Sequence, residues 1–311
     1  MADQRINITP ICGAEINSLL NLWNRSVPTD PISLNRFETR ILLDPNVSRD
    51  GILTARVDQT LVGFAVTVLP QFALPRDKVA SDRCFVLMFG VSPDYRRKGV
   101  ATALFDHLER LAEEKGRTSV AIAPYPAGYL IPGVDKDNHV DAIAFLEQRG
   151  YMQHGEDSLA MDAQIALYTV PEEIIEKQKQ LRKEGIAIRP YRRADILDVI
   201  EFMAETMPPD WTENYARRNL RALPAGGFMG DQLMLAFDGE RIIGFCQFEG
   251  EHFGPFGVAD GYQGRGIGTV LLSRTLEKMR EHEAHGAWVL WTGERAAKGV
   301  YSRLGFSVTR R

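Results

Sequence analysis

Cysteine is scarce in this chain of 311 residues, and none of its three cysteines lies at CxxC spacing. Cys12, Cys84 and Cys246 are odd in number and far apart, so the sequence predicts reduced, structural thiols and no disulfide framework. Long hydrophobic runs are also missing, since no apolar stretch approaches the roughly 20 residues that a transmembrane helix needs. These absences exclude a disulfide-stapled scaffold and an integral membrane protein.

An excess of positive charge is missing as well. The formal net charge is −4, so nothing predicts the basic footprint of a nucleic-acid-binding protein. The first residues, Met1 to Arg5, lack the basic and apolar regions of a secretory leader. We therefore expect a cytoplasmic protein that binds neither nucleic acid nor a membrane.

Two glycine-rich turns are the most informative feature that is present. The first turn reads Arg96-Arg97-Lys98-Gly99-Val100-Ala101, and the second turn reads Gln263-Gly264-Arg265-Gly266-Ile267-Gly268. Each follows an apolar run that predicts a strand, 85–91 or 253–258, and each opens an amphipathic helix. Backbone N–H groups at a helix start are unpaired, and the helix dipole there favours negative charge. Each turn therefore predicts a phosphate-binding site.

The surroundings of the two turns repeat as well. Residues 119–123 after the first helix correspond to 287–291 after the second, and both runs predict buried strands. Residues 145–151 correspond to 300–306, a helix end closed by glycine and followed by an aromatic residue that we expect to start a strand. The chain is thus predicted to contain two copies of one unit.

The two copies predict two domains, 1–167 and 186–311, joined by a helical linker at 168–185. The length agrees, because domains commonly have about 100–200 residues. The charged run from Glu172 to Glu184 predicts the linker helix, and Gly185 closes it. Little sequence follows Phe306. Either the last strand of the second domain is short, or the first domain supplies sheet edge or covering surface to the second.

At these residues the chain resembles the GNAT superfamily of acetyl-CoA-dependent N-acetyltransferases. The family signature is Gln or Arg, two variable residues, Gly, one variable residue, then Gly or Ala, and both turns match it. A tyrosine four residues before a Gly-aromatic pair is also common in the family, and Tyr301, Gly305 and Phe306 match that pattern. The resemblance implies an α+β fold with α/β-type layering: two tandem GNAT folds, each a mixed, mostly antiparallel sheet flanked by helices.

The resemblance also implies acetyl-CoA as co-substrate, with its pyrophosphate on the backbone N–H groups of the turns. Glycine permits close approach, Arg and Lys add positive charge, and threonine adds a hydroxyl donor. The oxyanion donor is expected to be a backbone N–H at 256–258. The predicted cofactor-binding residues are Val91, Arg96, Arg97, Lys98, Gly99, Val100, Ala101 and Thr102 in the first copy, and Phe256, Val258, Gln263, Gly264, Arg265, Gly266, Ile267, Gly268 and Thr269 in the second.

Tyr301 is the predicted general acid, because a phenol can protonate the departing thiolate and the residue matches the family position. Glu251 is the predicted general base, and Glu249, His252 and Glu294 are the alternatives. The acceptor is expected to be a small-molecule or peptide amine that attacks the thioester directly. No metal is required by this chemistry.

Leucine stands where the first copy should carry the acid, since Leu146 occupies the position of Tyr301. Leucine cannot donate a proton, so we expect the C-terminal domain to catalyse and the N-terminal domain to be degenerate. Tyr125 and Tyr129 are the candidates to replace the missing acid. The chain is expected to be a monomer or a homodimer.

Three other interpretations each fit part of the sequence. A non-catalytic acyl-CoA sensor or assembly protein would use the same turns for binding alone. A dinucleotide site fits less well, because Thr269 replaces the last glycine of GxGxxG and the acidic ribose ligand is missing. A metal site at His282 and His285 is disfavoured, because their spacing is not that of a zincin helix.

Overall fold

The computed structural model describes residues 5–71, 82–123, 125, 130–131, 133–206 and 212–311. The chain divides into two compact units, Met1–Gly133 and Val134–Arg311. We refer to them as the first unit and the second unit. The first unit contains β1 (Asn7–Pro10), α1 (Ile16–Ser26), α2 (Leu34–Phe37), β2 (Ile52–Val57), β3 (Thr60–Val68), β4 (Arg83–Val91), α3 (Val100–Glu114) and β5 (Ser119–Ile122).

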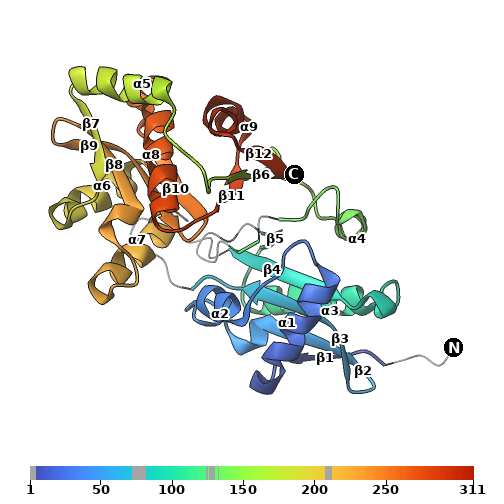
Figure 1. Ribbon diagram of the computed structural model, residues 1–311. Helices are drawn as coiled ribbons and strands as arrows, with labels where there is room; N and C mark the ends of the chain where they lie inside the picture. The colour runs from blue at the N-terminus through green and yellow to red at the C-terminus, as the bar shows by residue number, and fades with distance from the viewer. Residues whose placement is uncertain (1–4, 72–81, 124, 126–129, 132, 207–211) are drawn as a thin grey trace. The chain divides into compact units, whose positions relative to one another are not determined.

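The second unit begins with an element of the first sequence copy. Its helices and strands, drawn in Figure 1, are α4 (Val140–Gln148), β6 (Leu159–Gln164), α5 (Glu172–Lys183), β7 (Ile186–Pro190), α6 (Ile196–Thr206), α7 (Thr212–Ala222), β8 (Leu233–Asp238), β9 (Arg241–Glu249), β10 (His252–Val258), α8 (Ile267–Glu281), β11 (Gly286–Thr292), α9 (Glu294–Ala296) and β12 (Ser307–Arg310).

Each unit is built on one mixed sheet. The first sheet has five strands in the order β1-β2-β3-β4-β5, and β4 and β5 are its parallel pair. The second sheet has seven strands in the order β12-β6-β11-β10-β9-β8-β7, and β10 and β11 are its parallel pair. The other pairs are antiparallel, so the predicted mixed, mostly antiparallel sheets and the α+β class are confirmed.

Local sequence explains most of these elements. Asp58 and Gln59 adopt positive φ between β2 and β3, as a two-residue hairpin turn requires. The apolar face of α1 buries Leu19, Leu22 and Trp23 against the first sheet. In the second unit, α8 packs on one face of the sheet, and the buried side chains of α6 and α7 pack on the other.

The strand β6 is the main departure from the expected organisation. It comes from the first sequence copy, yet it lies between β11 and β12 in the second sheet, with Ala287 opposite Ala163 and Val308 opposite Met161 (Figure 1). A strand was expected to start at Tyr151, but none begins before Leu159. Both alternatives for the end of the second sheet are therefore realised: β12 is short, and the first copy supplies a strand. The domain bounds 1–167 and 186–311 stay a prediction.

A polar contact fixes the segment before β6 to the last strand. Asp135 is buried and forms an ion pair with Arg310, at 3.2 Å between Oδ2 and Nε. The backbone N–H of Lys136 donates to the carbonyl of Arg311 at 3.0 Å. Burial opposes ionisation of Asp135, but hydrogen bonds from Asn138 and the charge of Arg310 outweigh it and leave its pKa below the usual value.

Among the described residues, no helix combines the length and the apolar character that crossing a bilayer demands.

We predict that residues 186–311 alone do not fold, because β11 and β12 then lack the strand that joins them. Burial of Leu159 and Met161 would be lost at the same time. Thermal unfolding followed by circular dichroism should show a cooperative transition for the fragment 134–311 and none for 186–311. A cooperative transition in the shorter fragment would contradict the essential role of β6.

Candidate active site

The two glycine turns have the same backbone conformation. Gly99 and Gly266 are the N-cap residues of α3 and α8, with φ of 81° and 84°, and both helices have 15 residues. At the position two residues earlier, Arg97 and Gly264 also have positive φ, 59° and 76°. Within the described ranges, no side chain caps either helix. The first N–H groups of both helices therefore remain for an anionic ligand.

The first side chain of each turn points back toward its own strand. Arg96 Nε donates to the carbonyl of Val91 at 3.4 Å, and Gln263 Nε2 donates to the carbonyl of Val258 at 3.1 Å. Arg96 also donates to the carbonyl of Ser26 at 3.2 Å. These bonds hold each turn to the end of its strand. The structure thus gives Arg96 and Gln263 a positioning contact, and their predicted contact with the cofactor stays a prediction.

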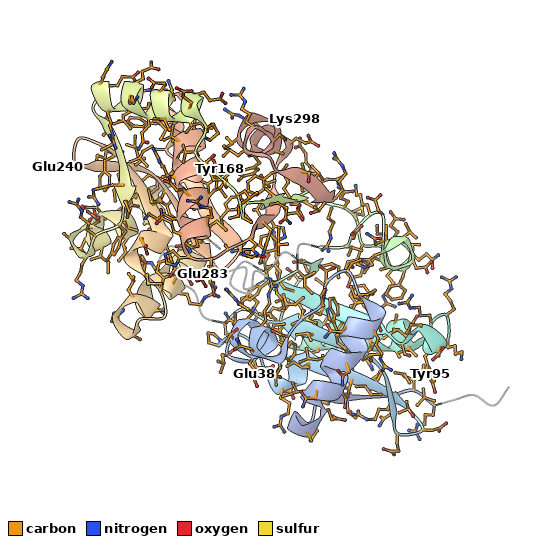
Figure 2. The ribbon with its side chains drawn as sticks, viewed as in Figure 1. Glu38, Tyr95, Tyr168, Glu240, Glu283 and Lys298 are labelled. Carbon is orange, nitrogen blue, oxygen red and sulfur yellow. The ribbon has the colours of Figure 1, made fainter. Side chains whose placement is uncertain are left out.

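The basic residue before each N-cap glycine lies over a tyrosine ring. Lys98 Nζ is 5.1 Å from the ring centre of Tyr95, which is labelled in Figure 2, and Arg265 is 5.7 Å from that of Tyr262. Arg265 also donates to Glu184 at 2.8 Å, and this hydrogen bond is the main cause that lowers the pKa of Glu184. Because that ion pair is exposed, it is weak, and a phosphate could replace the carboxylate.

A cation that the sequence did not reveal lies across the second turn. The side chain of Lys177 on α5 passes so close to Gly266 that a Cβ there would be 2.8 Å from Lys177 Cε. Its ammonium donates to the neutral amide of Gln180 at 3.2 Å. A cation at the positive end of a helix is unfavourable unless an anion lies between them. The sequence predicts α5 only as part of the linker, because no local motif marks this tertiary contact.

The strand β10 parts from β11 almost at once. His252 and Trp288 are the paired residues, and the N–H of Trp288 donates to the carbonyl of Glu251 at 2.9 Å. The register with β9 then shifts between Phe253 and Phe256, a β-bulge. In the first unit, by contrast, β4 stays paired with β5 from Arg83 to Val86. At matched positions the pairing of the second sheet therefore ends one residue before that of the first, ahead of the backbone at 256–258 where the oxyanion donor was predicted.

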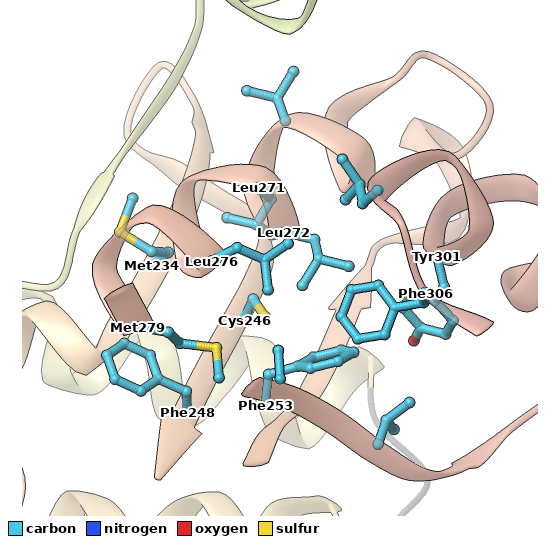
Figure 3. Packing of buried hydrophobic residues seen from close by; sticks show 14 of the residues in the cluster. Met234, Cys246, Phe248, Phe253, Leu271, Leu272, Leu276, Met279, Tyr301 and Phe306 are labelled. Atoms are coloured by element: carbon cyan, nitrogen blue, oxygen red, sulfur yellow. The ribbon is translucent and has the colours of Figure 1, made fainter. Parts of the chain in front are cut away.

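Tyr301 lies beside the strand that opens. Its side chain is buried, and its ring centre lies 5.5 Å from that of Phe253 and 6.2 Å from that of Phe256. Figure 3 shows Tyr301, Phe306 and Phe253 grouped next to the leucines of α8. The ring of Phe256 also approaches the second turn, since a Cβ on Gly268 would be 3.3 Å from it. Tyr301 is thus linked through Phe256 to the start of α8.

Leu146 lies in α4, and Tyr301 ends a π-helical turn, Ala297–Tyr301, that follows α9. The glycine turns that come after these two residues match in geometry as well as in sequence. The N–H of Tyr151 donates to the carbonyl of Leu146 at 3.0 Å, and the N–H of Phe306 donates to that of Tyr301 at 3.2 Å. The glycines between them have φ of 86° and 87°. The replacement of tyrosine by leucine therefore occurs at a matched position.

The carboxylate of Glu251 is occupied by backbone donors. Its Oε1 accepts from the N–H of Gly286 at 2.8 Å and from that of His285 at 3.2 Å, so it ties the β9–β10 turn to the start of β11. Its predicted role as general base stays a prediction. Glu294 is bonded to Lys298 and Arg311, and these bonds lower its pKa, which makes it a weaker base.

The replacement acid proposed for the first copy is engaged elsewhere. Tyr125 is buried, donates to Asp44 at 2.9 Å and accepts from Asn46 at 3.1 Å. Burial is the main cause that raises its pKa, and the charge of Asp44 raises it further. Its proton is therefore tightly held. Tyr129 lies outside the described residues.

One face of the sheet differs in polarity between the copies. In the first unit, Val66, Val68 and Phe85 lie in the apolar core with α1 and α2. Val68 is opposite Phe85, and the matching pair in the second unit is Glu249 and His252. When the two sheets are aligned on these pairs, Val66 of β3 corresponds to Gln247 of β9. Aligning the two copies strand by strand would have revealed this change, which single motifs do not.

The three polar residues of the second unit lie near one another at the opening. His252 is 5% exposed, and its ring lies 4.6 Å from that of Trp288. Glu249 lies 4.0 Å from Arg218 of α7. We call Gln247, Glu249 and His252 the polar face. It lies on the α6–α7 side of the sheet, whereas Tyr301 packs on the α8 side.

The family model described as acetyltransferase (GNAT) family matches residues 16–151 and 196–306. The chain belongs to the GNAT acetyltransferase family. The split match confirms two GNAT domains in tandem. No protein with curated annotation matches the chain.

Solved structures show the same GNAT architecture. The chain is similar over its whole length to the GCN5-related glucosamine N-acetyltransferase region of a fungal multi-domain GH3 β-N-acetylglucosaminidase, with a TM-score of 0.82 and 18% identity, but it spans only 38% of that chain. The chain is also similar to a GCN5-related N-acetyltransferase from Sphaerobacter thermophilus, with a TM-score of 0.67 and 18% identity; the match covers 98% of this chain and 93% of that one. A tandem GNAT protein from the clavulanic acid biosynthesis pathway matches with a TM-score of 0.63 and 17% identity, over 99% of this chain and 96% of that one. At these identities the similarity establishes the fold.

We predict that acetyl-CoA binds this GNAT protein at two sites, one per turn. Calorimetry should show that Gly99→Val abolishes one site and Gly266→Val the other, because valine is strained at these φ values and blocks close approach. Gly116→Val and Gly239→Val are matched controls, since both glycines have positive φ and open space around them. Equal losses in the controls would attribute the effect to destabilisation.

We also predict that one of the three cysteines reacts with a thiol reagent at pH 8. Burial raises the pKa of Cys246 to about 12 and that of Cys84 to about 11, so both stay protonated well above pH 8, whereas Cys12 is exposed. Ellman titration should find one thiol in the native protein and all three in denaturant. Rapid native labelling of Cys246 would instead support an acyl-carrying thiol.

Proposed function

We propose that the second copy transfers an acetyl group from acetyl-CoA to an amine, with Tyr301 as the general acid. The observation that carries this proposal is the position of Tyr301 against Phe253 and Phe256, on the strand that leaves β11 beside the second turn. The matched position in the first copy holds Leu146. Family membership supports acyl transfer.

The residues of the second copy suit the separate steps of this reaction. The pyrophosphate would bind the N–H groups of Ile267, Gly268 and Thr269, and Arg265 and Lys177 would add positive charge. The thioester would lie in the opening between β10 and β11, where a backbone N–H at 256–258 stabilises the oxyanion. The amine nitrogen attacks the carbonyl carbon, the carbon–sulfur bond breaks, and the phenol of Tyr301 donates its proton to the sulfur.

The amine must also lose a proton during the reaction. His252 is the base we favour, because an imidazole accepts protons near neutral pH and the residue lies on the polar face at the point where the strands part. Glu251 would then act by positioning, since its carboxylate already accepts two backbone N–H groups. A water molecule could link the amine to the imidazole.

The first copy is proposed to bind acetyl-CoA without turning it over. The equivalent of the polar face is apolar there, and Leu146 cannot donate a proton. A chain in which both copies only bind acyl-CoA, as a sensor, is the competing function, and it predicts cofactor affinity without release of free thiol. We propose a cytoplasmic monomer or homodimer that acts on a small-molecule or peptide amine.

We predict that Tyr301→Phe lowers kcat by about 100-fold or more, in the range typical of a lost general acid. Affinity for acetyl-CoA should stay the same, because phenylalanine preserves the packing against Phe253 and Phe306. Release of free thiol with an amine acceptor measures kcat, and calorimetry measures affinity.

Tyr168→Phe is the matched control. It removes one partly buried hydroxyl, whose oxygen lies 2.6 Å from the hydroxyl oxygen of Ser273. We expect it to keep kcat. Unchanged kcat in Tyr301→Phe would disprove the role of the phenol.

A further inference from the structure

Gln247 in the middle of β9 is fully buried, with 0% exposure. Neither its Nε2 nor its Oε1 has a hydrogen-bond partner among the residues that the structure describes. Leaving both atoms of a buried amide unpaired costs stability. A side chain that lowers stability in this way needs a reason outside the folded chain itself.

The β-bulge in β10 lies opposite this glutamine. The register passes from Phe253 opposite Phe248 directly to Phe256 opposite Cys246, so Gln247 faces the bulged residues Gly254 and Pro255. Across the sheet it pairs with Leu233, on the side that carries Phe245 and the α6–α7 core. Gln247 therefore lies on the polar face, where β10 turns away from β11.

The first copy shows that the fold does not require a polar residue here. Val66 holds the corresponding position in β3 and is buried in an apolar core. The same exchange of apolar for polar residues gives Glu249 in place of Val68 and His252 in place of Phe85. Three polar replacements gathered on one face of one copy indicate a binding surface.

A second buried amide occurs on the helix that packs beside this surface. Asn219 of α7 is 6% exposed, and its Nδ2 has no hydrogen-bond partner in the described part of the chain. The preceding residue, Arg218, approaches Glu249, and α7 packs against β10. The side chain of Trp288, half-exposed beside His252, adds an apolar wall.

We propose that Gln247 hydrogen-bonds a hydroxyl group of the acceptor, so that the preferred acceptor is a hydroxylated amine such as an amino alcohol or amino sugar. This inference rests on the proposed acetyl transfer by the second copy. A carboxamide both donates and accepts, and so does a hydroxyl, so the two groups satisfy each other. A purely apolar amine would leave the amide unpaired, and sites built for a hydroxyl discriminate strongly against analogues that lack it.

The test compares trans-2-aminocyclohexanol with cyclohexylamine, two amines that differ by one hydroxyl. With the wild-type chain, kcat/KM from thiol release should be at least about tenfold higher for the hydroxylated amine. Gln247→Leu should remove that preference while leaving acetyl-CoA affinity unchanged. Its melting temperature should not fall, because leucine has nearly the same volume and removes an unpaired amide.

Ile243→Val is the control for a general disturbance of the core, since Ile243 is buried in the same strand on the α8 side. It should keep the preference for the hydroxylated amine. Equal rates for the two amines in the wild type, a preference that persists in Gln247→Leu, or a clearly lower melting temperature of that variant would each overturn the inference.

The two proposals fail in different ways. If thiol is released with other amines but with neither cyclohexyl compound, or without regard to the hydroxyl, acetyl transfer stands and the role of Gln247 is wrong. If no amine in a broad panel releases thiol although acetyl-CoA binds, the proposed function itself is wrong.

Discussion

The early separation of β10 from β11 is the constraint on which the rest of the second unit depends. Neighbouring parallel strands are normally joined by evenly spaced backbone hydrogen bonds, whereas the pairing of β10 with β11 is confined to His252 and Trp288. The backbone that follows is paired with β9 through Phe256, Gly257 and Val258. The turn at Gly266 begins the helix α8 on one face of this sheet, Tyr301 packs on that same face, and the polar face lies on the other.

The two copies show what the fold needs and what the proposed function adds. Both preserve the helix N-caps, the positive-φ glycines and the bond that ties each turn to its strand. They differ where a reaction would occur: Leu146 against Tyr301, Val66 against Gln247, Phe85 against His252. In the first unit Val66 and Phe85 complete an apolar core that includes Tyr125. Matched positions thus carry apolar residues in the first copy and the residues of the proposed chemistry in the second.

Local signals in the sequence predicted much of this structure. The glycine turns, the Asp58-Gln59 hairpin and the amphipathic helices follow from residues close together in the chain, so motifs were sufficient to find them. The place of β6 was beyond such signals, because Met161 pairs with Val308, far away in sequence. The same limit hid Lys177 at Gly266, the backbone donors on Glu251 and the burial of Gln247. Each of these depends on tertiary packing that no short pattern encodes.

The insertion of β6 between β11 and β12 also affects the order in which the protein can be completed during synthesis. Residues 159–164 leave the ribosome long before residues 286–292 and 307–310. The backbone N–H and C=O groups on both edges of β6 therefore lack their partner strands until the rest of the chain is made. Contacts of such long sequence separation form slowly. Nascent chains of this protein therefore carry an unpaired strand until the last strand has been made, and this follows from the order of the strands in the sheet alone.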